Sequence, residues 1–105
     1  VVADLQAALK RHGYPEAIIF GHALDGNLHF VFAQGFADAD AIRRYGALMD
    51  EVAEIIVRRY DGSLKAEHGT GVNMAPYVER EWGAKLTALM WKLKRLAKTF
   101  RQTAV

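Results

Sequence analysis

The pattern of apolar and polar residues along the chain predicts three amphipathic helices. Apolar residues recur with helical spacing over 2–12, over about five turns that follow Asp38 and Asp40, and over 84–100. Either aspartate can cap the second of these helices, because a carboxylate at a helix N-terminus accepts backbone N–H groups and faces the positive end of the helix dipole. A shorter helix is expected over 74–82, and a glycine separates it from the last one.

Two short apolar runs, 17–20 and 30–32, predict β-strands joined in a hairpin. The Asp-Gly dipeptide at 25–26 is a strong signal for a two-residue turn. Counting outward from that turn pairs His22 with His29, and directly paired residues of antiparallel strands point to the same face. The sequence therefore predicts two imidazoles side by side, with an apolar opposite face that packs against a helix.

A third strand is expected over 63–66, which gives an α+β fold: an antiparallel sheet, made of the hairpin plus this strand, covered by helices. The 105 residues suit one domain or less. The sequence begins at Val1 without an initiator Met, so we interpret it as a piece of a longer protein. A free edge of its sheet is expected to let copies of the piece pair with one another.

Composition narrows the classes of function. The chain has no cysteine, so disulfides and thiolate metal sites are excluded, and any metal must use His, Asp or Glu. No acidic residue follows Glu81, whereas six cations do. A basic terminal helix can bind nucleic acid. The continuous apolar stripe of this helix favours the solvated face of an ordinary amphipathic helix instead, and we expect no nucleic-acid partner.

The histidines carry the candidate chemistry. His12 lies at a helix end and is expected to be structural. His22 and His29, placed together on a hairpin, would repel each other if both were protonated, and a divalent metal between them removes that problem. Glu67 and His68 are the obvious source of a third ligand, and three protein ligands with an open position are typical of a catalytic metal site. The alternative is a non-catalytic α+β binding or assembly module in which the histidines are structural.

Three blocks occur in order along 18–100: Gly21-His22 through Asn27-Leu28-His29, then Gly62 through Gly71, then Met74-Ala75-Pro76-Tyr77 with Glu81-Trp82-Gly83. Together they resemble the C-terminal domain of FAD-linked oxidases, a family that includes D-lactate, glycolate and D-2-hydroxyglutarate dehydrogenases. The second and third blocks are similar to the bacterial branch in which this flavoprotein is fused to an iron–sulfur domain. The resemblance implies that 1–105 is the C-terminal part of a substrate (cap) domain, with the FAD domain and the upstream half absent.

The resemblance also implies roles for individual residues. His22, His29 and Glu67 would bind a divalent metal, Zn²⁺ or Mn²⁺, that holds the hydroxyl and carboxylate of a small 2-hydroxy acid. His68 would be the catalytic base that takes the hydroxyl proton while FAD accepts the hydride.

The same resemblance implies that the cofactor side of the pocket includes Asn27, Gly69 and Gly71. The chain differs from the family at Val31, where Asn is frequent, and at Val72, where a basic residue is common.

The partners that the resemblance implies are the 2-hydroxy acid and the FAD domain of the same parent chain, whose enzyme is an FAD-dependent D-2-hydroxy acid dehydrogenase. An iron–sulfur cluster would lie elsewhere in the parent. The expected location is the cytoplasm, with peripheral attachment to the inner membrane or to an electron-transfer partner as a variant. The fragment alone is expected to be inactive, because the residues that recognise the acid in the family lie upstream of Val1.

Overall fold

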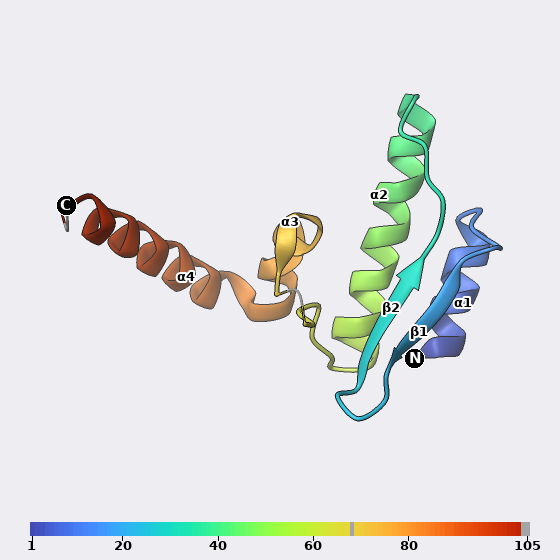
Figure 1. The fold of residues 1–105 in the computed structure, drawn as a ribbon, viewed down its shortest axis with the longest axis horizontal. Helices are drawn as coiled ribbons and strands as arrows, with labels where there is room; N and C mark the ends of the chain where they lie inside the picture. Colours follow the sequence, from blue (N-terminus) through green and yellow to red (C-terminus); the bar gives the residue numbers. More distant parts are fainter. Residues whose placement is uncertain (68, 104–105) are drawn as a thin grey trace.

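The computed structural model describes residues 1–67 and 69–103, with side chains described as far as Arg101. The elements, in chain order, are α1 (Val2–Arg11), β1 (Ile18–His22), β2 (Asn27–Val31), α2 (Ala39–Ala53), the π-helix η1 (Glu54–Arg59), α3 (Gly71–Met74), the 3₁₀ turn η2 (Ala75–Tyr77) and α4 (Val78–Thr103). Figure 1 shows the hairpin beside α1 and α2, with α4 extending away from them. The chain is therefore α+β, as predicted.

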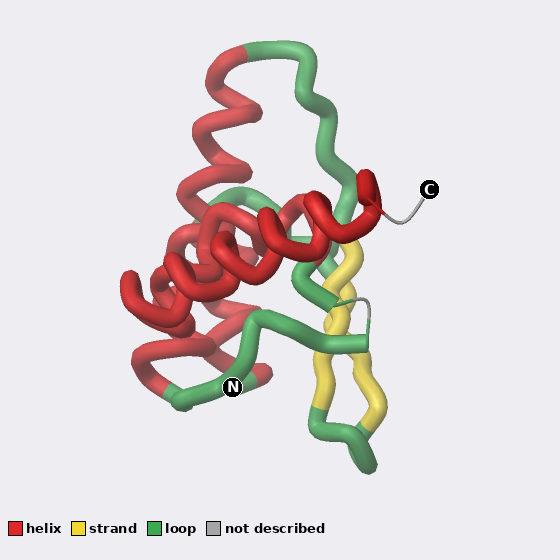
Figure 2. The backbone as a smooth tube through the Cα atoms, turned by 90° about the vertical axis from the view of Figure 1, so that its left-hand side faces the viewer, coloured by secondary structure: helices red, strands yellow, loops and turns green. Residues whose placement is uncertain are grey.

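The hairpin forms one layer, and α1 with α2 forms the other (Figures 1 and 2). The apolar sides of the two helices meet in a buried core that comprises Leu5, Ala8, Leu9, Tyr14, Leu48, Val52 and Ile55. Ile19, Leu28 and Phe30 of the hairpin are partly buried against this core. The prediction that one hairpin face packs against a helix is confirmed, and the opposite face, which carries the histidines, is left away from the core.

Helix α2 begins where a side chain caps it. The backbone of Asp38 is extended (φ −137°, ψ 166°), and its carboxylate accepts a hydrogen bond from the N–H of Ala41 at 2.7 Å. This bond satisfies one of the backbone donors that the first turn of a helix leaves free. Of the two aspartates that the sequence offered, Asp38 is the cap, while Asp40 lies inside the first turn and pairs with Arg43.

The hairpin register differs from the prediction by two residues. The structure pairs His22 with Asn27 and Phe20 with His29, instead of His22 with His29. The predicted two-residue turn is a four-residue loop, closed by hydrogen bonds from Asp25 N–H to His22 O and from Gly26 N–H to Ala23 O. A shift of two residues leaves every side chain on its predicted face, because the side-chain period of a strand is two.

The predicted third strand over 63–66 is wrong. Within the described residues the sheet has two strands, and the segment contributes one isolated bridge, Ala66 to Gly69. Its backbone donors are used by side chains instead of a ladder: Leu64 N–H donates to Glu81 Oε2 at 3.1 Å, and Lys65 N–H to Ser63 Oγ at 3.0 Å. Pairing of copies through the outer edges of β1 and β2 stays a prediction.

The last helix follows the predicted boundaries but not the predicted packing. The helical run breaks at Gly83, whose φ of 78° is a conformation that glycine adopts readily and other residues rarely do. The helix that follows carries the expected apolar stripe. In the described part of the chain this stripe is exposed, with relative accessibilities of 40–79% at Leu86, Leu89, Met90, Leu93, Leu96 and Phe100. None of the described helices is both long and apolar enough to cross a membrane.

A polar contact joins α1 to α2. Arg11 donates to one carboxylate oxygen of Glu51, and the Nε2 atom of His12 lies 2.6 Å from the other. The Arg11 hydrogen bond, followed by that of His12, holds the pKa of Glu51 below its ordinary value of 4.5. This contact agrees with the structural role expected for His12.

We expect this contact to stabilise the fold at neutral pH and not in acid. A carboxylate whose pKa is lower in the folded state stabilises the fold above its unfolded-state pKa, and that stabilisation is lost as the pH falls through the folded-state value. Urea unfolding at about pH 7 should find wild type more stable than Glu51→Gln by up to about 1 kcal/mol, as for partly exposed ion pairs. The two should converge as the pH falls from about 5 to about 3. A pH-independent difference would contradict this assignment.

Candidate metal centre

Three side chains from two separate parts of the chain meet at one point. The Nε2 atoms of His22 and His29 lie 3.6 and 3.3 Å from the two carboxylate oxygens of Glu67. One ligand atom from each of the three residues lies within 4.8 Å of the others. The imidazole rings meet edge to face, with centroids 5.6 Å apart. The residues that the sequence singled out as metal ligands therefore converge in space.

The hairpin positions the two histidines through its tight strand pairing. Gly21 lies between Phe20 and His22, and a Cβ atom built on it would be 2.1 Å from the carbonyl oxygen of Asn27. Only glycine allows so close an approach of the two strands. At the end of the pairing, the N–H of His22 donates to Oδ1 of Asn27 at 3.1 Å. These contacts place the imidazoles as diagonal neighbours on the same face.

A tight turn positions Glu67. The π-helix η1 ends with Gly62 N–H donating to Ile56 O at 2.8 Å, and the chain then turns toward the hairpin. The bond from Leu64 N–H to Glu81 ties the loop to α4. Gly69 N–H then donates to Ala66 O at 3.0 Å, which closes a turn with Glu67 inside it. The carboxylate is thus held in front of the hairpin by a loop that is anchored on both sides.

The three side chains fit a divalent metal. Two imidazole nitrogens and a carboxylate oxygen are donors that suit Zn²⁺ and Mn²⁺. Bonds of about 2.1 Å at tetrahedral angles separate ligand atoms by about 3.4 Å. The Nε2 atom of His29 lies 3.3 Å from Oε1 of Glu67 and that of His22 lies 3.6 Å from Oε2, and one atom from each residue lies within 4.8 Å of the others. The side chains of His22 and Glu67 are 55% and 43% exposed, so the site can be reached from solvent.

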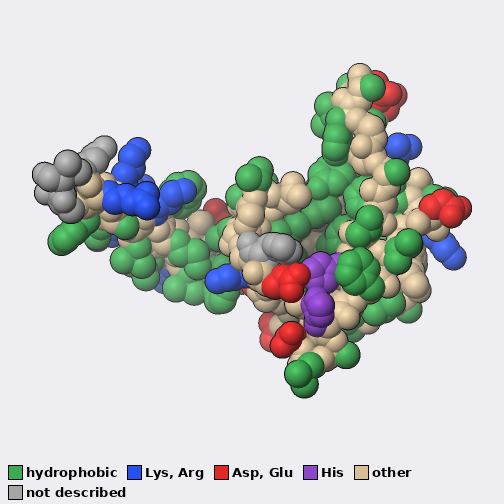
Figure 3. Space-filling model, in the orientation of Figure 1, with side chains coloured by type: hydrophobic (Ala, Val, Ile, Leu, Met, Phe, Trp, Pro, Cys, Tyr) green, Lys and Arg blue, Asp and Glu red, His purple; other side chains and the backbone are tan. Residues whose placement is uncertain are grey.

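The surroundings of the cluster are asymmetric. In Figure 3 the histidine side chains lie at the surface, with acidic side chains on one side and hydrophobic side chains on the other. The hydrophobic side includes Phe20, whose ring is stacked on that of His29 with centroids 5.2 Å apart and planes 6° apart.

A cavity of about 680 Å³ adjoins the cluster, and Glu67 is one of the residues that line it. Leu28 and Phe30, which face the core, contribute to its wall, together with η1 and the loop 62–67. Of the residues that the structure describes, His22 and His29 do not line it. Glu67 therefore borders the cavity and also lies beside the two imidazoles.

The remaining predicted site residues lie around this cluster. The Asn27 side chain is engaged with the backbone of His22. Gly69 and Gly71 follow Glu67 and both have positive φ, 68° and 65°, so their backbone takes a path that other residues rarely adopt. The predicted base, His68, lies outside the described residues.

Sequence reasoning missed three residues that shape the site. Phe20 covers one ring of the histidine pair, Glu81 anchors the loop, and Gly21 sets the distance between the strands. Gly21 had a readable signal, because a glycine inside a strand often marks a close approach of backbone. The contact of Phe20 with His29 can be predicted only from the correct strand register. The role of Glu81 depends on a contact between segments that are distant in the sequence.

Comparison with known proteins places the chain in a family. The family model of FAD linked oxidases, C-terminal domain, matches residues 1–97. The chain belongs to this family. The match covers every element up to most of α4, so α4 is part of the family's domain. No solved structure matches the chain.

The chain is similar to several proteins that carry the same name. It is 34% identical over 90% of its length to the D-2-hydroxyglutarate dehydrogenase of Xanthomonas citri pv. viticola, of which it covers 21%. It is 34% identical over 72% of its length to that of Stutzerimonas stutzeri, of which it covers 17%. It is 31% identical over 93% of its length to that of Haemophilus influenzae, of which it covers 9%. The chain thus spans about a fifth or less of these relatives.

Proposed function

We propose that this chain is the metal-bearing part of the substrate pocket of a flavin-dependent D-2-hydroxy acid dehydrogenase. The hydroxyl of an acid such as D-lactate or D-2-hydroxyglutarate would become a keto group, with the proton passing to a base and the hydride to FAD. The observation that carries the proposal is the convergence of His22, His29 and Glu67 in a chain of the FAD-linked oxidase family. The names of the relatives support the 2-hydroxy acid class.

In this proposal the cluster binds and orients the substrate. His22, His29 and Glu67 would hold Zn²⁺ or Mn²⁺, and three protein ligands leave a coordination position for a substrate oxygen. A bound divalent cation lowers the pKa of a coordinated hydroxyl. The carboxylate of Glu67 offsets part of the positive charge of the ion, and the hairpin fixes the two imidazoles before any ligand arrives, so little ordering is needed on binding.

The rest of the parent enzyme belongs to the same proposal. An FAD domain of the same polypeptide would bind the flavin, with 1–105 as the C-terminal part of the cap domain and Asn27, Gly69 and Gly71 on its cofactor side. His68 is proposed as the base. An iron–sulfur domain elsewhere in the parent, and a location in the cytoplasm or peripherally at the inner membrane, complete it. The 105 residues alone are expected to be inactive.

Calorimetric titration with Zn²⁺ and Mn²⁺ tests the metal site. We expect wild type to bind one equivalent and His29→Ala to bind at least about tenfold more weakly, because a ligand is lost. His12→Ala is the matched control, since His12 contacts Glu51 and not the cluster. Circular dichroism checks that each variant is folded. Equal affinity in all three proteins, or no binding by wild type, would overturn the metal site and favour the module with structural histidines.

A further inference from the structure

On the face of the hairpin that carries the histidines, three apolar side chains lie beside the cluster, on the side away from the turn. Ile18 and Phe20 of β1 share this face with His22, and Val31 of β2 shares it with His29. The relative accessibilities of Ile18, Phe20 and Val31 are 64%, 51% and 57%. Three large apolar side chains are therefore presented to solvent directly beside the candidate metal ligands, whereas the opposite face of the same strands is packed against the core.

These side chains form a continuous wall. Phe20 pairs directly with His29 and is stacked on its ring, and Ile18 pairs directly with Val31 one step further along the strands. Directly paired residues have Cβ atoms about 4.5–5.5 Å apart. The wall thus begins at the imidazole of His29 and runs along the strands away from His22 and the hairpin turn.

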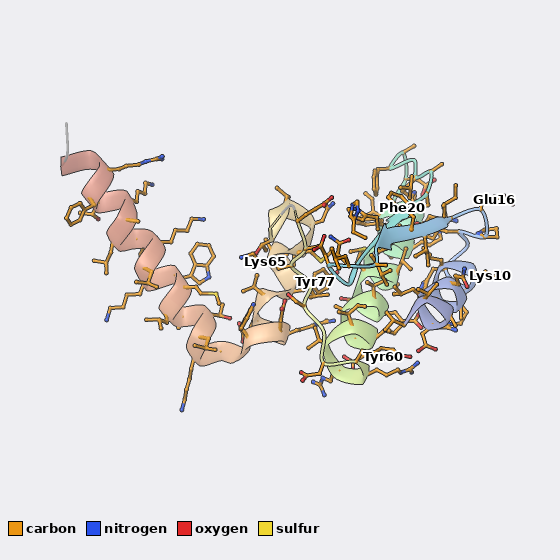
Figure 4. The ribbon with its side chains drawn as sticks, turned by 60° about the horizontal axis from the view of Figure 1, so that its bottom comes forward. Lys10, Glu16, Phe20, Tyr60, Lys65 and Tyr77 are labelled. Carbon is orange, nitrogen blue, oxygen red and sulfur yellow. The ribbon has the colours of Figure 1, made fainter. Side chains whose placement is uncertain are left out.

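The charged groups near the cluster belong to the loop of Glu67 and not to the strands. Lys65 belongs to the loop of Glu67, and it borders both the cavity that Glu67 lines and a groove against α4. Figure 4 shows it away from Phe20. The strand residues on the histidine face are Ile18, Phe20, His22, Asn27, His29 and Val31, and none is a lysine or an arginine. A carboxylate placed on the wall would lose hydration without gaining a cation from the strands.

We infer that the 2-hydroxy acid recognised here has an apolar side chain that rests on Phe20, Val31 and Ile18. This inference rests on the proposed function, because the metal cluster must hold the acid for its side chain to reach the wall. An aliphatic or aromatic side chain gains from leaving water on this surface, whereas the second carboxylate of a dicarboxylic acid does not. Val31 is the wall residue chosen for the test, because its paired residue is Ile18, whereas Phe20 is paired with the metal ligand His29.

Binding of four acids to the zinc-loaded full-length flavoprotein tests the inference: D-lactate, D-2-hydroxyisocaproate, D-3-phenyllactate and D-2-hydroxyglutarate, followed through the methyl resonances of Ile18 and Val31. We expect D-2-hydroxyisocaproate to bind about tenfold more tightly than D-lactate. Its side chain has three more carbons, and a tenfold gain in affinity is roughly half of the free energy that their complete burial would contribute. D-2-hydroxyglutarate should bind no more tightly than D-lactate. In the full-length flavoprotein, kcat/KM should follow the same order.

Val31→Asn separates the wall from the metal. We expect this variant to bind Zn²⁺ as wild type does and to reduce the preference for D-2-hydroxyisocaproate at least about threefold. Val2→Asn on α1 is the matched control and should keep the preference. Preference for D-2-hydroxyglutarate, no effect of Val31→Asn, or zinc binding without any acid binding would overturn the inference and leave the metal site standing. Failure to bind Zn²⁺ would overturn the proposed function itself.

Discussion

Replacing Gly21 with alanine should destabilise the hairpin and weaken metal binding together. The new Cβ atom would lie 2.1 Å from the carbonyl oxygen of Asn27 and 3.1 Å from the Cα atom of Leu28. Both are backbone atoms, so the clash is relieved only if β2 moves. We expect the free energy of unfolding to fall by about 3 kcal/mol, the upper end of the range for overpacking, as measured by urea denaturation.

The same movement should reach the metal ligands. His22 follows Gly21 directly and His29 lies on the strand that must shift, so their Nε2 atoms would no longer keep the present separations from Glu67. Zn²⁺ affinity should therefore fall at least about tenfold, because displaced ligands bind poorly.

Gly46→Ala is the control for a glycine replaced without a clash. Gly46 lies inside α2, and a Cβ atom there would meet nothing within 4 Å. Alanine favours a helix interior over glycine by up to about 1 kcal/mol, so this variant should be as stable as wild type or more stable. If Gly21→Ala were tolerated as well as Gly46→Ala, the close pairing of β1 with β2 would be in question.

The sequence predicted the histidine face correctly although it predicted the register wrongly. The Asp-Gly signal located the reversal of the chain, but the loop has four residues. Asn27 is the first residue of β2, and its side chain accepts a hydrogen bond from the N–H of His22. The resulting shift is even, and an even shift preserves faces. The direct partner of His29 changes to Phe20, which no count from a two-residue turn could give.

Local chemistry and long-range contacts explain the other outcomes. Asp38 and Gly83 act through their own backbone neighbourhoods, so the start of α2 and the break in α4 could be read from the sequence. The loop 63–66 has alternating residues that suit a strand, yet its donors are satisfied by Ser63 and by Glu81, which is distant in sequence. A strand pattern specifies a strand only when a partner edge is within reach.

Convergence of the metal ligands could be predicted only in part. The hairpin brings His22 and His29 together through local pairing, which the sequence signals. Glu67 reaches them from 38 residues beyond His29 through the path of η1 and the loop, which no local pattern specifies. Its assignment came from the resemblance of the surrounding motif to a family, and the structure brings its carboxylate to the imidazoles.

Replacing Glu67 with alanine should remove metal binding and leave the fold intact. The carboxylate supplies the negatively charged ligand of the cluster, and losing it should lower Zn²⁺ affinity at least about 100-fold, beyond the tenfold to 100-fold cost of removing an outer-shell partner. The side chain is 43% exposed, so without metal the unfolding free energy should change by no more than about 0.5 kcal/mol. Glu16→Ala, a carboxylate on the turn before β1 (Figure 4), is the matched control and should bind Zn²⁺ as wild type does.

Metal-dependent unfolding distinguishes a binding role of Glu67 from a structural one. A ligand that binds only the folded state stabilises it by about 2.7 kcal/mol at a concentration 100 times its dissociation constant. Wild type and Glu16→Ala should therefore gain stability on addition of Zn²⁺, and Glu67→Ala should gain almost none at the same concentration. If Glu67 served only as an ion-pair partner of His22 and His29, the outcome would be reversed: Glu67→Ala would be less stable without metal and would respond to Zn²⁺ as wild type does. The two roles thus predict opposite results in the same pair of unfolding curves, because a metal ligand acts through the ion and an ion-pair partner acts in its absence.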